Sequence, residues 1–100
     1  MEENHHTAYM KMQQEESVLF SKTVLMRSDV IDGMIEGATA ASPVRFLSIQ
    51  GLTLDNVSRV LTALRNLRNL ERLFLGIQSV IQHSFVLGTG RSVRQNSGHL

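Results

Sequence analysis

Leucine recurs at every third residue across 61–73 of this chain. An α-helix places apolar residues at a period of 3.6, and a half-buried strand places them at a period of 2. Steps of three residues advance about 300° around a helix, so five such leucines would spread over about 240° of its circumference. No single helix face could bury all of them. The run therefore predicts two different elements joined by a loop.

The first of these elements is a helix over residues 56–66. Its apolar residues follow the i, i+3, i+4, i+7 spacing of an amphipathic helix, at Val57, Val60, Leu61 and Leu64. Asp55 precedes them, and a carboxylate in that position can accept the free N–H groups of a first turn. We therefore expect Asp55 to be the N-cap, and residues 66–69 to form the loop that leaves the helix.

Two strands are expected on either side of this helix. In residues 70–76, Leu73 and Leu75 alternate with polar or outward positions, and in residues 44–51, Leu47 and Ile49 do the same. Alignment of the two segments pairs Leu47 with Leu73 and Ile49 with Leu75, and both pairs have the same separation along the chain. The chain therefore contains a repeated strand–helix unit.

A fainter copy of the unit lies upstream, in residues 21–38. Val24 and Met26 would take the strand positions, and a short helix follows, weakened by two glycines, with apolar residues at Ile31, Met34, Ile35 and Ala38. Ile77, Val80 and Ile81 could begin another helix after the last strand. Strands alternating with helices in this way favour a parallel sheet.

Strands of the form L-x-x-L-x-L, spaced about 20–29 residues apart, are the signature of leucine-rich repeats. The segment LERLFL, at residues 70–75, matches this form fully, and VRFLSI, at residues 44–49, matches it conservatively. The chain resembles the ribonuclease-inhibitor-like class of that family. The resemblance implies an α/β stack of two to three strand–helix units with a small parallel sheet. The alternative is a doubly wound βαβαβ domain with helices on both faces.

The array is short, and one motif position departs from the family. The position three residues after the last strand leucine should hold Asn or Cys, and here Asp29, Leu52 and Gln78 occupy it. A short or truncated array exposes both ends of its stack, so its open ends would need a partner or further repeats.

Residues 17–87 are expected to form the ordered domain. Residues 1–16 are polar and acidic and predict a disordered tail, whereas residues 88–100 are rich in Gly, Ser and Arg and predict a flexible basic tail. The polar N-terminus does not resemble a signal peptide, and no run of about 18 apolar residues predicts a membrane span. With no cysteine in the chain, these features favour a cytoplasmic or nuclear protein.

Charge is distributed unevenly although the net charge is only +1. Residues 1–40 contain three basic and seven acidic residues, whereas residues 41–100 contain seven arginines and two acids. A basic half can attract an acidic partner or nucleic acid. Because the arginines are scattered, a nucleic-acid-associated protein is the alternative rather than the preferred interpretation.

No pattern in the chain predicts catalysis, a metal site or a cofactor. His5 and His6 are adjacent but do not make a closed metal site. His83 and Ser84 lack the G-x-S-x-G context of a nucleophile elbow. The segment GTGR, at residues 88–91, lacks the lysine of a phosphate-binding loop. We therefore predict a non-enzymatic protein.

In leucine-rich repeat proteins, the outward side of the strands is the concave binding surface. The resemblance places Phe46 and Ser48 of the second strand there, with Arg72 and Phe74 of the third, and Arg45 beside them. Aromatic residues with arginines are the usual composition of binding hot spots. The sequence therefore predicts a protein-interaction module whose partner-binding residues are Arg45, Phe46, Ser48, Arg72 and Phe74.

Overall fold

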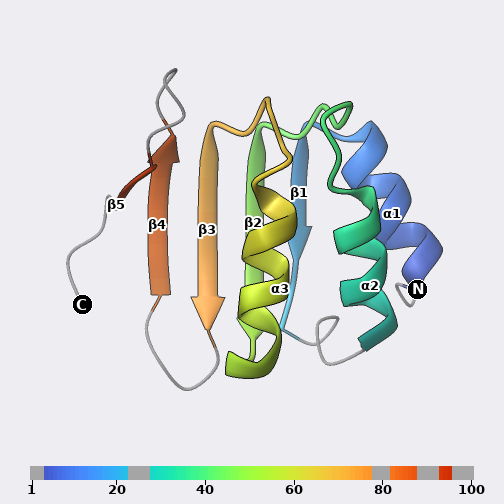
Figure 1. The fold of residues 1–100 in the computed structure, drawn as a ribbon, viewed down its shortest axis with the longest axis horizontal. Coiled ribbons are helices and arrows are strands. Elements are labelled where there is room, and N and C mark those ends of the chain that lie inside the picture. Colours follow the sequence, from blue (N-terminus) through green and yellow to red (C-terminus); the bar gives the residue numbers. More distant parts are fainter. Residues whose placement is uncertain (1–3, 23–27, 78–81, 88–92, 96–100) are drawn as a thin grey trace.

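The computed structural model describes residues 4–22, 28–77, 82–87 and 93–95 of the chain. Within these residues, helices and strands alternate and two further strands follow, in the order α1 (His5–Gln14), β1 (Ser17–Phe20), α2 (Ser28–Gly37), β2 (Phe46–Leu52), α3 (Leu54–Leu64), β3 (Arg72–Ile77), β4 (Gln82–Leu87) and β5 (Val93–Gln95). The strands form one sheet in chain order (Figure 1). Strands β1 to β3 are parallel, β4 pairs antiparallel with β3, and β5 pairs antiparallel with β4. The predicted α/β fold with a small parallel sheet is confirmed.

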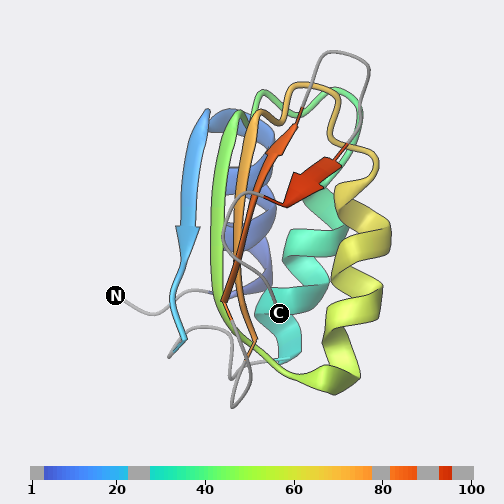
Figure 2. The same ribbon diagram turned by 90° about the vertical axis from the view of Figure 1, so that its left-hand side faces the viewer.

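All three described helices lie against the same face of the sheet. The edge-on view in Figure 2 shows the sheet as one layer and α1, α2 and α3 as the other. No described helix covers the opposite face of β1, β2 and β3. The doubly wound alternative, which requires helices on both faces, is therefore wrong for this part of the chain.

The register of β2 and β3 follows the pairing predicted from the sequence. Leu47 lies beside Leu73, and Ile49 lies beside Leu75. Their side chains point toward the helices and are buried, as are those of Val44 and Leu70 before the strands. Strand residues alternate between the two faces, so this register also fixes which side chains face away from the helices.

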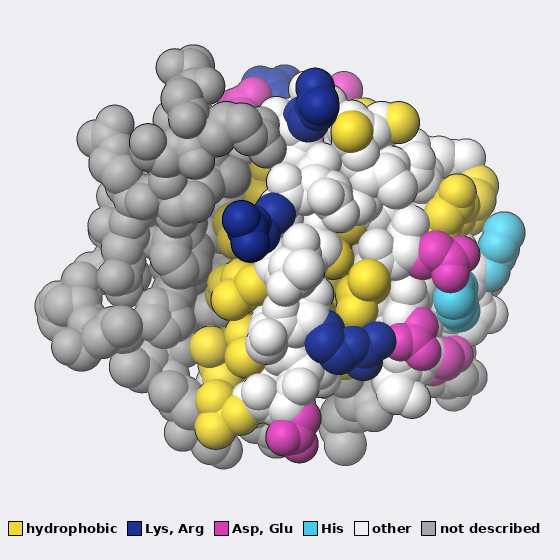
Figure 3. All heavy atoms as spheres, in the orientation of Figure 1, with side chains coloured by type: hydrophobic (Ala, Val, Ile, Leu, Met, Phe, Trp, Pro, Cys, Tyr) yellow, Lys and Arg dark blue, Asp and Glu magenta, His cyan; other side chains and the backbone are white. Residues whose placement is uncertain are grey.

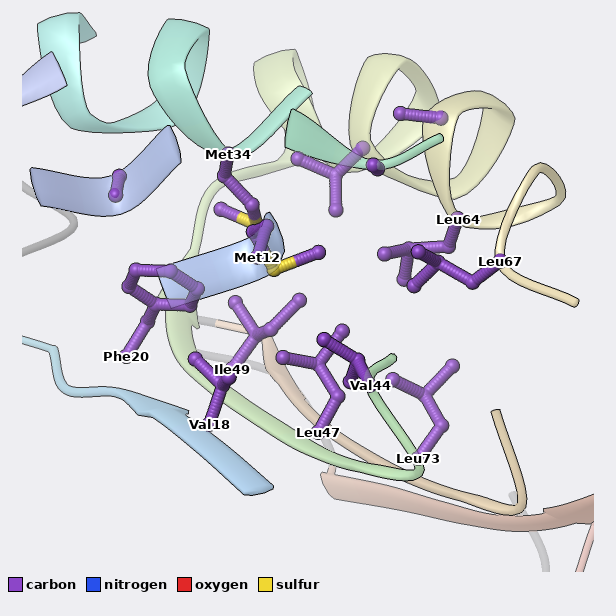
Figure 4. Packing of buried hydrophobic residues seen from close by; sticks show 14 of the residues in the cluster. Met12, Val18, Phe20, Met34, Val44, Leu47, Ile49, Leu64, Leu67 and Leu73 are labelled. Carbon is purple, nitrogen blue, oxygen red and sulfur yellow. The ribbon is translucent and has the colours of Figure 1, made fainter. Parts of the chain in front are cut away.

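The core lies between the sheet and the helix layer. Figure 4 shows side chains from β1, β2 and β3 pointing toward those of the helices. Leu64 of α3 and Leu73 of β3, both expected to be buried in the same unit, are 6% and 8% exposed. Helix α3 begins earlier than expected, at Leu54. Thr53 is its N-cap, and its N–H donates to the side chain of Asn56 at 3.0 Å. The prediction of Asp55 as the N-cap is therefore wrong.

The first strand was predicted at the wrong place. Strand β1 is Ser17–Phe20, and Val18 and Phe20, rather than Val24 and Met26, lie beside Leu47 and Ile49 of β2. The first unit of the repeat is thus longer than predicted. Residues 23–27, which include Val24 and Met26, lie outside the described residues.

The N-terminal segment was also predicted wrongly, since most of the expected disordered tail of residues 1–16 is helix α1. Ala8 and Met12 of this helix are fully buried against the core. Asn4 caps its first turn by accepting a hydrogen bond from the N–H of Thr7 at 3.0 Å. The ordered domain therefore begins before residue 17, and its first helix covers the β1 end of the core.

The C-terminal part differs from the prediction as well. Ile77 ends β3 instead of beginning a helix, and the remaining residues of that expected helix, Val80 and Ile81, lie outside the described residues. Strand β5 falls within the expected flexible tail of residues 88–100, and the rest of that tail is not described.

Candidate functional site

The helix-free face of the sheet carries four of the five residues predicted to bind a partner. Phe46 and Ser48 of β2 and Arg72 and Phe74 of β3 alternate with the buried core residues of these strands. Phe46 lies beside Arg72, and Ser48 lies beside Phe74. Phe46 is 36% exposed, and Phe74 is partly buried. The strand register therefore brings these side chains together on one surface.

A further residue of this surface was missed in the sequence. Leu19 of β1 lies beside Ser48 of β2 and is 58% exposed. It was missed because the first strand was predicted too late in the chain, which placed residue 19 outside any strand. Alternation of Val18 and Phe20 around Leu19 was the available signal. Leu19, Phe46 and Phe74 lie on the same face of three neighbouring strands, with Ser48 between Leu19 and Phe74. We call these three apolar residues the sheet-face patch.

Two arginines lie over the ring of Phe46. The guanidinium carbon of Arg45 is 5.5 Å from the ring centroid, and that of Arg72 is 5.8 Å from it. Cations at this distance are attracted by the negative face of an aromatic ring. The two contacts hold Phe46 in place and cover part of its ring with charge, so the sheet-face patch has a cationic border at the start of β2 and β3.

Arg45 also belongs to a row of charges along the starting ends of the three parallel strands. Its Nε donates to Glu71 at 2.8 Å, and its Nη1 lies 3.5 Å from Glu16. Glu16 immediately precedes β1, Arg45 precedes β2, and Glu71 precedes β3. The main chain repeats the pattern: the carbonyl of Glu16 accepts from the N–H of Arg45, and the carbonyl of Arg45 accepts from the N–H of Glu71, both at 2.8 Å.

The Glu16–Arg45–Glu71 row has a clear electrostatic consequence. The hydrogen bond from Arg45 lowers the pKa of Glu71, and the same bond raises the pKa of Arg45. The carboxylate side chains are 67% exposed for Glu16 and 51% exposed for Glu71. Ion pairs this accessible to water contribute little to stability. The row therefore neutralises Arg45 more than it strengthens the fold.

The two arginines of the site consequently have different roles. Arg45 is engaged by two carboxylates of its own chain, whereas Arg72 has no ion-pair partner within the described residues. Arg72 is exposed and lies over the ring of Phe46, at the border of the sheet-face patch. The charge of Arg72 also contributes to lowering the pKa of Glu71, after the larger effect of the hydrogen bond from Arg45.

The described residues contain no group of three or more His, Asp or Glu side chains placed to hold a metal ion. None of the helices in the described part of the chain is both long and apolar enough to cross a membrane. Comparison of the chain with protein-family models, curated proteins and solved structures found no match. The resemblance to leucine-rich repeats therefore stays a prediction from the sequence.

Proposed function

We propose that this chain is a non-enzymatic protein-interaction module that binds a protein partner on the helix-free face of β1, β2 and β3. The observation that carries the proposal is the sheet-face patch, where Leu19 is 58% exposed and Phe46 is 36% exposed. Large apolar side chains grouped on a surface mark an interaction site more often than single ones do. The helix layer on one side and the repeated register support a relationship to leucine-rich repeats.

The chemistry of the patch suggests what the partner presents. Its centre is apolar, and Arg72 lies at its border. A suitable partner segment carries an aliphatic side chain beside a carboxylate. The aliphatic side chain would be buried against Phe46 and Phe74, and the carboxylate would pair with Arg72. Arg45 supports the position of Phe46 and is less suited to contact the partner carboxylate, because Glu16 and Glu71 already engage it.

The proposal is tested by substitution on the two sides of the molecule. Peptides selected from a displayed random library against the parent protein would be titrated against Phe46→Ala and Phe74→Ala. We expect each substitution to weaken binding by about 2 kcal/mol, or roughly 30-fold, with little loss of fold. The control is Arg59→Ala on α3, which removes an exposed ion pair with Asp32. Equal effects from both sides, or unfolding of Phe74→Ala, would contradict the proposal.

Nucleic-acid binding through the arginines of residues 41–100 is the second candidate. Two of these arginines, Arg45 and Arg59, already pair with carboxylates of the chain, which weakens the case for a phosphate-binding surface. A salt titration separates the two functions. Binding through phosphates falls steeply with the logarithm of salt concentration, whereas binding centred on Phe46 and Phe74 should change little. Nuclease treatment before the capture of partners provides a second check.

A further inference from the structure

Two identical tripeptides lie between α3 and β3. Arg-Asn-Leu occurs at residues 65–67 and again at residues 68–70. Both tripeptides have the same structure, in which Arg and Asn occupy a turn and are exposed, and the leucine that follows is buried. The repeat therefore displays Arg65 and Arg68 at equivalent positions of two consecutive turns. We call residues 65–70 the RNL turns.

Buried side chains and hydrogen bonds hold the RNL turns in place. Leu67 is 1% exposed and Leu70 is 7% exposed. The N–H of Leu67 donates to the carbonyl of Leu64 at 3.1 Å, and the side chain of Asn69 donates to the carbonyl of Ser42 at 3.0 Å. A loop that is already fixed loses little conformational freedom when it binds. The arginines of the RNL turns are therefore well suited to recognise another molecule.

The RNL turns lead from the helix layer toward the sheet-face patch. The segment between α3 and β3 crosses the edge of the molecule at which the parallel strands begin (Figure 2). Arg72, the first residue of β3, lies over the ring of Phe46 on the helix-free face. Exposed arginines at positions 65, 68 and 72 thus follow one path from the end of α3, over this edge, to the patch.

Positive charge is in excess along this edge. Two carboxylates, Glu16 and Glu71, contact Arg45, and the edge also carries Arg72 and the two arginines of the RNL turns. Figure 3 shows Lys and Arg side chains along the edge, at the top of the view, with carboxylates beside them. The carboxyl end of α3 contributes the equivalent of about half a negative charge. This is less than the charge of Arg65 alone, so the excess remains.

We propose that the RNL turns bind an acidic segment of the protein partner, an inference that rests on the proposed function. The segment continues from the aliphatic side chain held at the sheet-face patch and crosses the edge with about four Asp or Glu residues. Four extended residues span about 13 Å. This length reaches along both turns, because residues 65 and 68 are at most about 10 Å apart.

The carboxylates of the edge favour a peptide over nucleic acid as the source of the negative charge. A nucleic-acid backbone carries closely and evenly spaced phosphates, and Glu16 and Glu71 would repel part of such a row. A peptide places its carboxylates opposite the arginines and presents an uncharged side chain to Phe46 and Phe74. Nucleic acid is therefore the alternative that the test has to separate.

The test uses the whole chain and the tightest peptide selected from the displayed random library. Four glutamates, or four glutamines as the uncharged match, extend this peptide at its N-terminus in one pair and at its C-terminus in another. At low salt, one of the glutamate extensions should bind about tenfold more tightly than its glutamine match. The advantage should shrink as salt screens the exposed charges.

Substitutions locate the advantage on the molecule. Arg65→Gln and Arg68→Gln should each remove part of it, and the double variant should remove most of it. Arg59→Gln is the matched control, because Arg59 is also exposed on α3 but pairs with Asp32 of α2. Thermal unfolding of each variant checks that the fold is retained.

The outcomes separate this inference from the proposed function. Equal affinity for the glutamate and glutamine peptides, with binding still weakened by Phe46→Ala and Phe74→Ala, would overturn the acidic segment and leave the proposed function standing. A glutamate advantage that survives the double variant would also overturn it. An advantage that needs both arginines, in a peptide indifferent to the two phenylalanines, would support the RNL turns and contradict the proposed function. Tighter binding of an oligothymidylate through the same arginines would assign the turns to nucleic acid instead.

Discussion

The two ends of the helix layer differ sharply although each is formed by a single helix. At the β1 end, Ala8 and Met12 of α1 are fully buried. At the other end, Leu54 and Leu61 of α3 remain exposed. Helix α3 is the more apolar of the two in sequence, yet it leaves these large side chains uncovered. Burial is therefore decided by the neighbouring element and not by the helix alone.

The neighbour of α1 is shaped to receive it. A Cβ atom added to Gly33 of α2 would lie 2.8 Å from the Cα of His5, and one added to Gly37 would lie 2.8 Å from the Cβ of Met12. Hydrogen bonds reinforce this approach, because the hydroxyl of buried Ser42 donates to the carbonyl of Met12, and Gln13 donates to Thr39 at 2.9 Å. Among the described residues, no such fit exists beside Leu54 and Leu61. The helix layer covers its apolar side chains at the β1 end, where Gly33 and Gly37 allow α1 to pack closely against α2.

The largest loss of stability is expected from substitution at the β1 end of the helix layer, where α1 packs against α2. Met12→Ala removes a fully buried side chain that packs between Phe20 and Met34 (Figure 4), and should lower the free energy of unfolding by about 2–5 kcal/mol. Urea denaturation followed by circular dichroism measures the change. Gln14→Ala, at an exposed position of the same helix, is the control. If Met12→Ala lowered the free energy of unfolding by less than Gln14→Ala does, α1 would not be part of the core.

A second substitution tests whether the glycines are responsible for this closure. Alanine in place of glycine within a helix is ordinarily stabilising by about 1 kcal/mol. Gly33→Ala should instead destabilise the fold by about 1–3 kcal/mol, because the added methyl group collides with the main chain of His5. Urea denaturation shows whether the free energy of unfolding falls or rises, and the sign of this change decides the question. A variant more stable than the parent would show that α1 can shift away without cost.

Substitution at the other end of the helix layer, on the exposed side of α3, should change stability much less. Leu61→Ser should change the free energy of unfolding by no more than about 0.5 kcal/mol, because its side chain is already in contact with water. Thermal unfolding of the variant and of the parent protein provides the value. A loss comparable to that of Met12→Ala would show that the flank of α3 is part of the core.

The smallest effect is expected from the Glu16–Arg45–Glu71 row, whose contacts are exposed. Since Arg45 lowers the pKa of Glu71, this carboxylate stabilises the fold above its unfolded pKa, and the contribution is lost as pH falls through the lower, folded pKa. Glu71→Gln should therefore flatten the acid side of a plot of unfolding temperature against pH. Glu15→Gln, an exposed substitution outside the row, should leave the plot unchanged. Salt screens exposed charges, so the difference between Glu71→Gln and the parent should shrink at high salt. A difference that high salt leaves unchanged would contradict an exposed ion pair.

The sequence predicted the central part of the fold because its signals there agree. The period-2 strands of residues 44–51 and 70–76 align at one spacing, and the helix between them has a clean apolar stripe. These features were enough to predict the register of Leu47 with Leu73, and hence the shared surface of Phe46, Ser48, Arg72 and Phe74. The contact of Arg45 with Glu16 was not predicted, because Glu16 was assigned to a tail.

The N-terminal part was predicted poorly for two physical reasons. A repeat of this kind accepts any spacing of about 20–29 residues, so spacing did not distinguish Val24 and Met26 from Val18 and Phe20. Helix α1 has only a weak apolar stripe, centred on Ala8 and Met12. The evidence for its burial lies in α2, where Gly33 and Gly37 were interpreted as weakening that helix. A glycine pair that lowers helix propensity can equally be a docking surface for another helix.

The register between β2 and β3 has a consequence for how this protein could grow. Residues 46–49 and 72–75 lie side by side without any offset, so a tandem duplication of residues 46–71 would insert one more strand and one more helix in phase with their neighbours. The inserted helix would place the side that carries its Arg59 equivalent against the side of the preceding helix that carries Leu54 and Leu61. A gene encoding this chain could thus lengthen its array one whole unit at a time, and each duplication would widen the sheet by one strand.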